Sequence, residues 1–145
     1  MAWVHGEIDI ERPVAEVFDY VADQSNEPEY NPRMVWAEKI TAGPVGKGTR
    51  FRSGVTAGRH TVPMLIECTR YERPTLFTTK TAMQQADIRY LLRFEPVAAG
   101  TRMHWSGQVK PKGVLRVLGP TISWLGNRQE RRIWESMKEH LEAQH

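Results

Sequence analysis

The chain has 145 residues, of which 40% are hydrophobic and 26% are charged, so it suits one globular domain that spans residues 1–145. Its net charge of +3 is too small to argue for a nucleic-acid partner, and its single cysteine, Cys68, excludes an internal disulfide and a cysteine-rich zinc site. Because no apolar run approaches the ~20 residues that cross a bilayer and no signal segment opens the chain, we expect a cytoplasmic protein.

Alternating and helical patterns divide the chain into a strand, a short helical region, six more strands and a long helix. The first strand is expected over residues 3–10. Pro13 then begins a short helix that ends near Asp23, because apolar residues recur there at steps of three and four. Prolines and asparagines end this helix, so a turn or a second short helix follows as far as Pro32. The further strands are expected at residues 34–40, 50–55, 61–71, 76–83, 87–95 and 101–109.

The alternation within each strand predicts which side chains point into the protein. The clearest case is residues 87–95, where Tyr90 and Leu92 share one face and Arg89 lies on the other. The same argument places Cys68 inward, as a small core residue rather than a nucleophile. Further inward positions are Phe51 and Ser53, Met64 and Ile66, Thr79 and Thr81, and Met103 and Trp105.

The long helix begins at Gly119-Pro120 and is expected to run for roughly 35 Å. Its apolar stripe contains Ile133, but polar Gln129 and His140 lie on the same stripe and Glu130 lies close beside it. Polar groups on a core-facing stripe either bond to neighbouring groups or face a cavity. A series of hairpin strands with one long amphipathic helix predicts an antiparallel α+β domain whose sheet curls around that helix.

A strand-proline-helix pattern at residues 8–23 is followed by Asn26 and by Tyr30-Asn31-Pro32. Gly46-Lys47-Gly48-Thr49 precedes the third strand, and residues 137–142 close the long helix. Together these segments resemble the polyketide cyclase/dehydrase group of the START-like (SRPBCC, birch-pollen-allergen-like) superfamily, over essentially the whole chain. Tyr30 stands where many members have tryptophan.

This resemblance implies a helix-grip fold, in which a seven-stranded antiparallel sheet curls around the C-terminal helix and two short helices follow the first strand. It also implies an apolar cavity between sheet and helix. Because the group includes cyclases, lipid carriers and hormone receptors, the fold implies a cavity but no particular reaction.

The cavity is expected where the inward strand faces meet the middle of the long helix. Gly126 removes a side chain from the apolar stripe and Gln129 adds a polar group, so helix and sheet should leave a gap. An apolar cavity with a few polar groups is the usual form of a small-molecule site. The residues expected to line it are Phe51, Ser53, Met64, Ile66, Thr79, Thr81, Tyr90, Leu92, Trp105, Gly126, Gln129 and Ile133.

Three functions are compatible with this arrangement. The first is binding of a small hydrophobic ligand, namely a lipid, a polyketide or an aromatic metabolite. The second is a polyketide cyclase or dehydratase. The inward polar groups suited to acid–base catalysis are Tyr90, Thr79, Thr81, Gln129 and His140. Alternatively, these groups form hydrogen bonds with one another or with water and have no catalytic role. The third is a protein-interaction module that uses the outer face. No catalytic residue is assigned. The histidine spacing predicts no metal site, and no cofactor is expected.

One surface feature bears on partners. Trp124 falls opposite the apolar stripe, near Lys110, Lys112, Arg116 and Arg128. This combination indicates either a cavity entrance that touches membranes transiently or packing of Trp124 against the preceding loop. A nucleic-acid site is not expected, because no sheet face carries the aromatic pairs that stack bases. We expect a monomer or a homodimer whose partner is a small hydrophobic molecule.

Overall fold

The computed structural model describes residues 2–84, 86–112 and 119–144, with their side chains except those of residues 2, 57 and 119–126. The elements follow the order expected from the sequence, and their boundaries differ from the expected ones by only a few residues. They are β1 (Ala2–Ile10), α1 (Val14–Ala22), the 3₁₀ helix η1 (Gln24–Glu29), β2 (Met34–Lys39), β3 (Arg50–Ala57), β4 (His60–Glu72), β5 (Leu76–Ala82), β6 (Ala86–Val97), β7 (Gly100–Pro111) and α2 (Gly119–Glu142).

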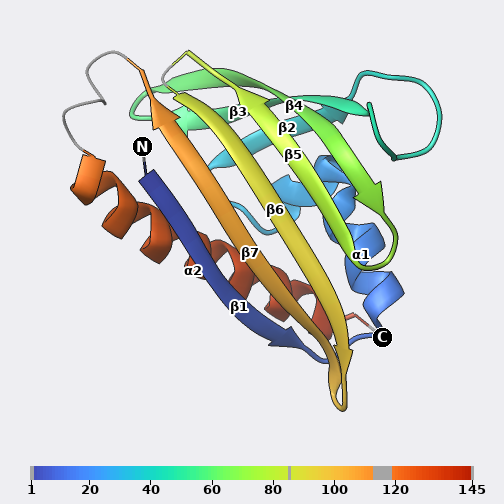
Figure 1. The fold of residues 1–145 in the computed structure, drawn as a ribbon. Helices are drawn as coiled ribbons and strands as arrows, with labels where there is room; N and C mark the ends of the chain where they lie inside the picture. Colours follow the sequence, from blue (N-terminus) through green and yellow to red (C-terminus); the bar gives the residue numbers. More distant parts are fainter. Residues whose placement is uncertain (1, 85, 113–118, 145) are drawn as a thin grey trace.

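Within the described residues, seven strands form one antiparallel sheet in the order β1-β7-β6-β5-β4-β3-β2. The first strand therefore pairs with the last, and β2 forms the opposite edge. The sheet curls past α2, and α1 and η1 lie on the same side of it (Figure 1). This arrangement confirms the predicted α+β helix-grip fold. None of the described helices has the length and apolar character that crossing a membrane requires.

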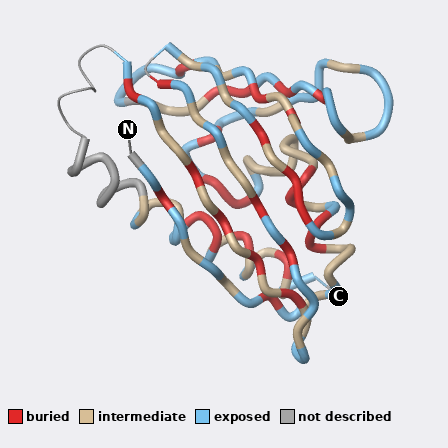
Figure 2. The backbone as a smooth tube through the Cα atoms, viewed as in Figure 1, coloured by how far each residue is buried: buried red, intermediate tan, exposed pale blue. Residues whose placement is uncertain are grey.

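Burial alternates along the strands as the sequence pattern predicts (Figure 2). On β6, Leu92 and Phe94 are buried whereas Arg93 and Glu95 are exposed. Since neighbouring side chains on a strand point to opposite faces, the sheet presents an apolar face to the helices and a polar face to solvent.

The buried side chains that the structure describes form two separate groups in the core. The larger group packs both helices on the middle strands: Phe18 on α1 meets Phe94 edge-on with ring centroids 5.2 Å apart, and Met137 on α2 is fully buried. The smaller group lies between β2, β3 and β4 and consists of Met34, Phe51 and Ile66. Members of both groups border the cavity described below, which therefore lies between them.

Hydrogen bonds attach α2 to β1 and to the turn that follows it. The backbone N–H of His5 donates to Asn127 Oδ1 (2.9 Å), and the N–H of Glu11 donates to Glu142 Oε2 (2.8 Å). The first contact lies one-third of the way along α2 and the second at its C-terminal end. They hold the apolar side of α2 toward the sheet.

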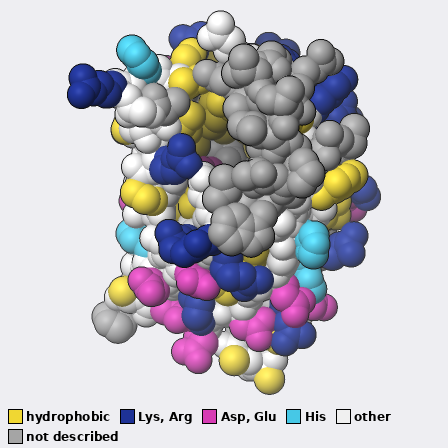
Figure 3. All heavy atoms as spheres, turned by 90° about the vertical axis from the view of Figure 1, so that its left-hand side faces the viewer, with side chains coloured by type: hydrophobic (Ala, Val, Ile, Leu, Met, Phe, Trp, Pro, Cys, Tyr) yellow, Lys and Arg dark blue, Asp and Glu magenta, His cyan; other side chains and the backbone are white. Residues whose placement is uncertain are grey.

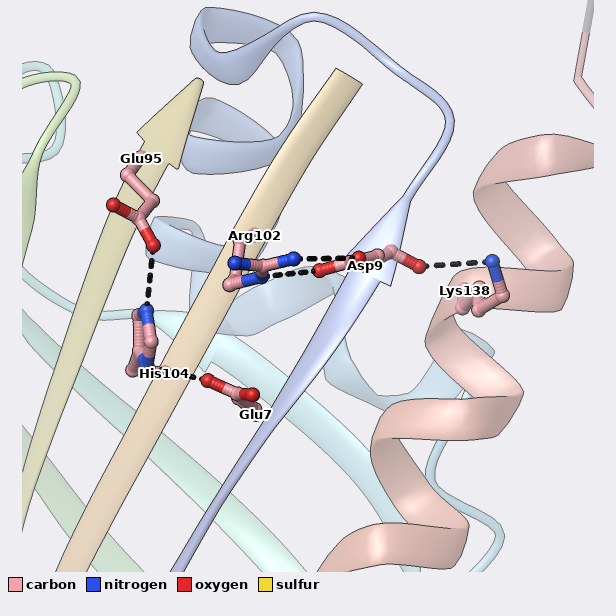
Figure 4. A network of polar contacts seen from close by, with 6 residues as sticks. All are labelled: Glu7, Asp9, Glu95, Arg102, His104 and Lys138. Carbon is pink, nitrogen blue, oxygen red and sulfur yellow. Dashed lines mark hydrogen bonds and ion pairs between the residues drawn. The ribbon is translucent and has the colours of Figure 1, made fainter. Parts of the chain in front are cut away.

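Charged side chains connect β1, β7, β6 and α2 at the surface (Figure 4). Arg102 Nε donates to Asp9 Oδ1 (2.8 Å), and this hydrogen bond lowers the pKa of Asp9. Lys138 Nζ donates to the backbone oxygen of Asp9 (2.8 Å). His104 contacts carboxylates on both neighbouring strands, Glu7 at 3.2 Å and Glu95 at 3.0 Å. Because these pairs are exposed to water, they align the strands but contribute little to stability.

Glycines stand directly opposite aromatic residues at three places in the sheet: Gly6 opposite Trp105, Gly54 opposite Trp36 and Gly107 opposite Tyr90. At Gly107, a Cβ atom would lie 2.9 Å from the ring of Tyr90 and 2.8 Å from the side chain of Val4. Such distances are too short for carbon atoms, so glycine is required for the Tyr90 ring to lie across β7.

Candidate functional site

A cavity of about 530 Å³ lies between the inner face of the sheet, the η1 region and α2. Apolar side chains that belong to the two core groups or pack against them form much of its wall, among them Met34, Met64, Ile66, Phe77, Leu92 and Trp134. Val62 and Met83, near the β3–β4 and β5–β6 connections, also border it. In the space-filling view of one side of the molecule, hydrophobic side chains gather toward the upper end, whereas Asp and Glu side chains gather toward the lower end (Figure 3).

Many of the sequence-predicted site residues meet in this cavity. Its lining includes Met64, Ile66, Thr79, Thr81, Tyr90, Leu92, Gln129 and Ile133. They come from β4, β5, β6 and α2, which the alternation and the helical stripe had placed facing one another. Gly126 and Trp124 lie in the part of α2 whose side chains are outside the described residues.

Phe51, Ser53 and Trp105 do not line the cavity, and here the prediction is corrected. All of them point inward as expected, but they are 1%, 0% and 2% exposed and lie in packed regions. Phe51 belongs to the smaller core group, and Ser53 is two residues further along β3. The Trp105 ring packs beside Trp134, with centroids 6.2 Å apart, and the guanidinium of Arg131 lies 5.5 Å from its ring centre. Strand alternation identifies the inner face, but it does not indicate where along that face the packing opens.

The η1 region contributes polar side chains to the wall of the cavity. Asp23 caps η1, because its Oδ1 accepts the backbone N–H of Ser25 (3.1 Å). Asn26 Nδ2 donates to the backbone oxygen of Tyr20 on α1 (3.0 Å). These contacts fix a short segment whose sequence has no helical period, and they present Glu27 to the cavity.

Two glutamates and a tyrosine form the polar centre of the cavity. Glu27 Oε2 accepts a hydrogen bond from Asn31 Nδ2 (2.7 Å). On the other side, Tyr90 donates its hydroxyl hydrogen to Glu130 Oε2, and Trp134 Nε1 donates to the Tyr90 oxygen (3.2 Å). Both carboxyl groups line the cavity, one from the η1 side and one from α2.

The other polar candidates have different positions. Gln129 lines the cavity, and its Oε1 accepts a hydrogen bond from Arg33 Nη1 (2.5 Å). His140, which was expected to face inward with the acid–base groups, lies outside the cavity lining. Its ring stacks on Tyr20 with centroids 5.7 Å apart, so it belongs to the contact between α1 and α2. Among the described residues, no group of three or more His, Cys, Asp and Glu side chains is arranged to hold a metal ion.

Comparison with known proteins identifies the fold family. Residues 1–142 match the sequence profile of a family described as polyketide cyclase / dehydrase and lipid transport. The chain belongs to this family. A comparison with curated proteins found no match.

Several solved structures with the same fold superpose on this chain of the polyketide cyclase/dehydrase family. A START superfamily protein from Mycobacterium smegmatis does so with a TM-score of 0.84 at 12% identity, with 98% of each chain covered. Ara h 8.0201 gives 0.77 at 15% identity, again with 98% of each chain covered. The di-domain ARO/CYC protein BexL from the BE-7585A biosynthetic pathway gives 0.77 at 18% identity, covering 98% of this chain and 47% of that one. At these identities the likeness shows a shared fold.

Burial changes the proton affinities of the polar centre in this family member. Burial, opposed by the hydrogen bond from Asn31 and reinforced by the charge of Glu130, raises the pKa of Glu27 to about 7. Burial also raises the pKa of Glu130. The pKa of Tyr90 lies well above its usual value, because the phenol is buried and Glu130 is beside it. The cavity therefore contains a neutral phenol and a carboxyl group able to gain or lose a proton near neutral pH.

Sequence reasoning missed Glu27 and Trp134 and did not include Glu130 in the cavity lining. Glu130 carried a signal, because it lies next to the apolar stripe of the long helix. Trp134 adjoins Ile133 and is 5% exposed, so the apolar side of α2 is broader than the narrow stripe suggested. Glu27 carried no comparable signal, since η1 is polar and has no period that separates an inner face from an outer one.

Proposed function

We propose that the protein binds a small hydrophobic molecule, namely a lipid, a polyketide or an aromatic metabolite, in the cavity between the sheet and α2. The observation that carries this proposal is the cavity itself, about 530 Å³ of mostly apolar wall with a few convergent polar groups. Ligand sites usually occupy about 300–1,000 Å³ and have this composition. The apolar wall would hold the body of the ligand, and Tyr90, Glu27 and Glu130 would bind its polar end.

A pair of neighbouring substitutions tests this proposal. Met64 faces the cavity from β4, whereas the next residue, Leu65, faces outward and is 40% exposed. We expect Met64→Trp to fill part of the cavity and to weaken binding of the neutral dye N-phenyl-1-naphthylamine by about tenfold or more, a loss of about 1.4 kcal/mol. The matched variant Leu65→Trp should bind the dye as the parent protein does.

The dye titrations are interpreted against urea unfolding curves of both variants, which establish that each is folded. Equal dye affinities for the two variants would contradict the proposal. They would favour the alternative of an interaction module that uses the outer face.

A second candidate, a cyclase or dehydratase, is favoured by one observation: two carboxyl groups and a tyrosine converge in the cavity. Cyclisation of a polyketide requires removal of a proton beside a carbonyl group and a donor that stabilises the resulting enolate. In this function Glu27 would act as the base, because its pKa of about 7 suits proton transfer near neutral pH. Tyr90 would act as the hydrogen-bond donor.

The binding and enzyme proposals differ in the expected behaviour of Glu27→Gln. If the protein only binds, this variant should retain dye binding and no substrate should turn over in the parent protein. If it is an enzyme, a poly-β-ketone substrate should be consumed by the parent protein and not by Glu27→Gln, while both proteins still bind the dye.

A further inference from the structure

We propose that the ligand is an amphipathic amine, whose protonated nitrogen lies between Glu27 and Glu130 while its apolar body occupies the rest of the cavity. This inference rests on the proposed binding function and specifies the ligand class. The inference is based on the hydrogen-bond partners of these two carboxyl groups inside the cavity, and not on the overall charge of the protein.

Among the described residues, only neutral groups donate hydrogen bonds to the two carboxyl groups. Glu27 accepts from the amide of Asn31, and Glu130 accepts from the hydroxyl of Tyr90. Neither carboxyl group forms an ion pair with a described residue, although two ionised oxygens offer about four acceptor positions. Acceptor capacity therefore remains on both carboxyl groups, which line the cavity from η1 and from α2.

No cationic side chain within the described lining neutralises them. Arg33 is the cation that borders the cavity, and it is exposed. Its Nη1 donates to Gln129 Oε1 (2.5 Å) and its Nη2 to the backbone oxygen of Thr56 (3.5 Å), both neutral acceptors. The charge that acts on Glu27 comes from Glu130 on α2. Glu27 itself acts on Tyr30 and Tyr90; Glu29 and Tyr20 also act on Tyr30, and none of these groups becomes a cation.

A cation satisfies this arrangement better than a neutral or anionic group does. Two carboxylates that line one cavity and are largely shielded from water repel each other, which is one reason that the pKa of Glu27 is raised. An ammonium group placed between them would offer three donors and would offset both charges. A carboxylate ligand, such as a fatty acid, would bring a third negative group into the same end of the cavity. The arrangement therefore selects amines against acids.

Three ligands that share one aromatic body test this inference. Tryptamine, tryptophol and indole-3-acetate carry an ammonium, a hydroxyl and a carboxylate on the same indole framework. In calorimetric titrations near neutral pH, we expect tryptamine to bind about tenfold or more tightly than tryptophol, because hydrogen bonds to charged groups are the stronger ones. Indole-3-acetate should bind most weakly. Glu130→Gln should remove most of the preference for tryptamine, whereas Glu38→Gln, exposed on β2, should leave it unchanged.

Proton release provides a second readout. Since a nearby cation favours the ionised carboxyl group, binding of tryptamine should lower the pKa of Glu27 and release part of a proton near neutral pH. The measured binding enthalpy should then depend on the ionisation enthalpy of the buffer for tryptamine but not for tryptophol. Glu27→Gln has no proton to release, so this buffer dependence should disappear in that variant.

The outcomes separate this inference from the binding function on which it rests. Tryptophol binding as tightly as tryptamine, or tryptamine binding without proton release, would overturn the amine proposal and leave the binding function standing. Absence of binding by all three indoles, with N-phenyl-1-naphthylamine still bound, would do the same. If the dye also fails to bind, the binding function itself is refuted.

Discussion

Glu27 makes the stability of the protein depend on pH in an unusual direction for a carboxyl group. Its pKa is raised from 4.5 to about 7 by burial. Between these values the unfolded chain loses the proton while the folded protein keeps it, so the free energy of unfolding falls as the pH rises. At about 1.4 kcal/mol for each pKa unit, this group alone lowers stability by up to about 3 kcal/mol between pH 4.5 and 7.

The substitution Glu27→Gln removes this titration and keeps the shape of the side chain. The glutamine oxygen can still accept the hydrogen bond that Asn31 donates to Glu27. Near pH 4 we expect the variant and the parent protein to have similar free energies of unfolding. Near pH 8 we expect the variant to be more stable, by as much as about 3 kcal/mol. Urea unfolding at a series of pH values measures the difference, and Glu38→Gln, exposed on β2, is the matched control.

The difference between the two curves isolates Glu27, because every other titrating group is common to both proteins. If the curves of Glu27→Gln and the parent protein run parallel from acid to neutral pH, Glu27 is not protonated in the folded protein. The reasoning from its burial and from the neighbouring Glu130 would then be wrong.

Three further predictions concern the helix, the sheet and the cysteine. In urea unfolding, Ile133→Ala should lower the free energy of unfolding by about 2–5 kcal/mol, whereas Arg131→Ala should lower it by no more than about 1 kcal/mol. Equal losses would mean that the assignment of the inward side of α2 is wrong. Tyr90→Ala should alter the fluorescence of bound N-phenyl-1-naphthylamine and Arg89→Ala should not; an unaltered Tyr90 variant would place the dye elsewhere. Cys68 is 4% exposed, and burial raises the pKa of its thiol. It should therefore react with a thiol reagent much faster in urea than in the native protein. Equal reaction rates would show that the thiol is accessible in the folded protein.

The arrangement of strands and helices was predictable from the sequence because its physical causes are local. The alternation of Tyr90 and Leu92 with Arg89 and Arg93 defines two faces of β6, and the structure has these faces as predicted. The apolar side of α2 was likewise readable from Ile133, which is 8% exposed. Once the order of elements was known, few arrangements other than a sheet curled around the helix would bury both surfaces.

The position of the cavity was only partly predictable, because it depends on how side chains pack at a distance in the sequence. Phe51 and Trp105 occupy inward positions as good as those of Met64, yet they lie in packed regions and Met64 borders the cavity. Glu27 could not be placed in the cavity at all. Its position depends on the capping of η1 by Asp23, a local contact that leaves no periodic pattern in the sequence.

The close approach between Gly107 and Tyr90 has a consequence for any attempt to change what the protein recognises. A residue without a side chain determines where the Tyr90 ring lies and therefore where its oxygen meets Glu130. In a mutant library selected for new ligands, position 107 would act as a determinant of specificity although it offers no group to contact a ligand. A library that keeps glycine there and varies Met64 and Thr79 would reshape the wall while retaining the anchor.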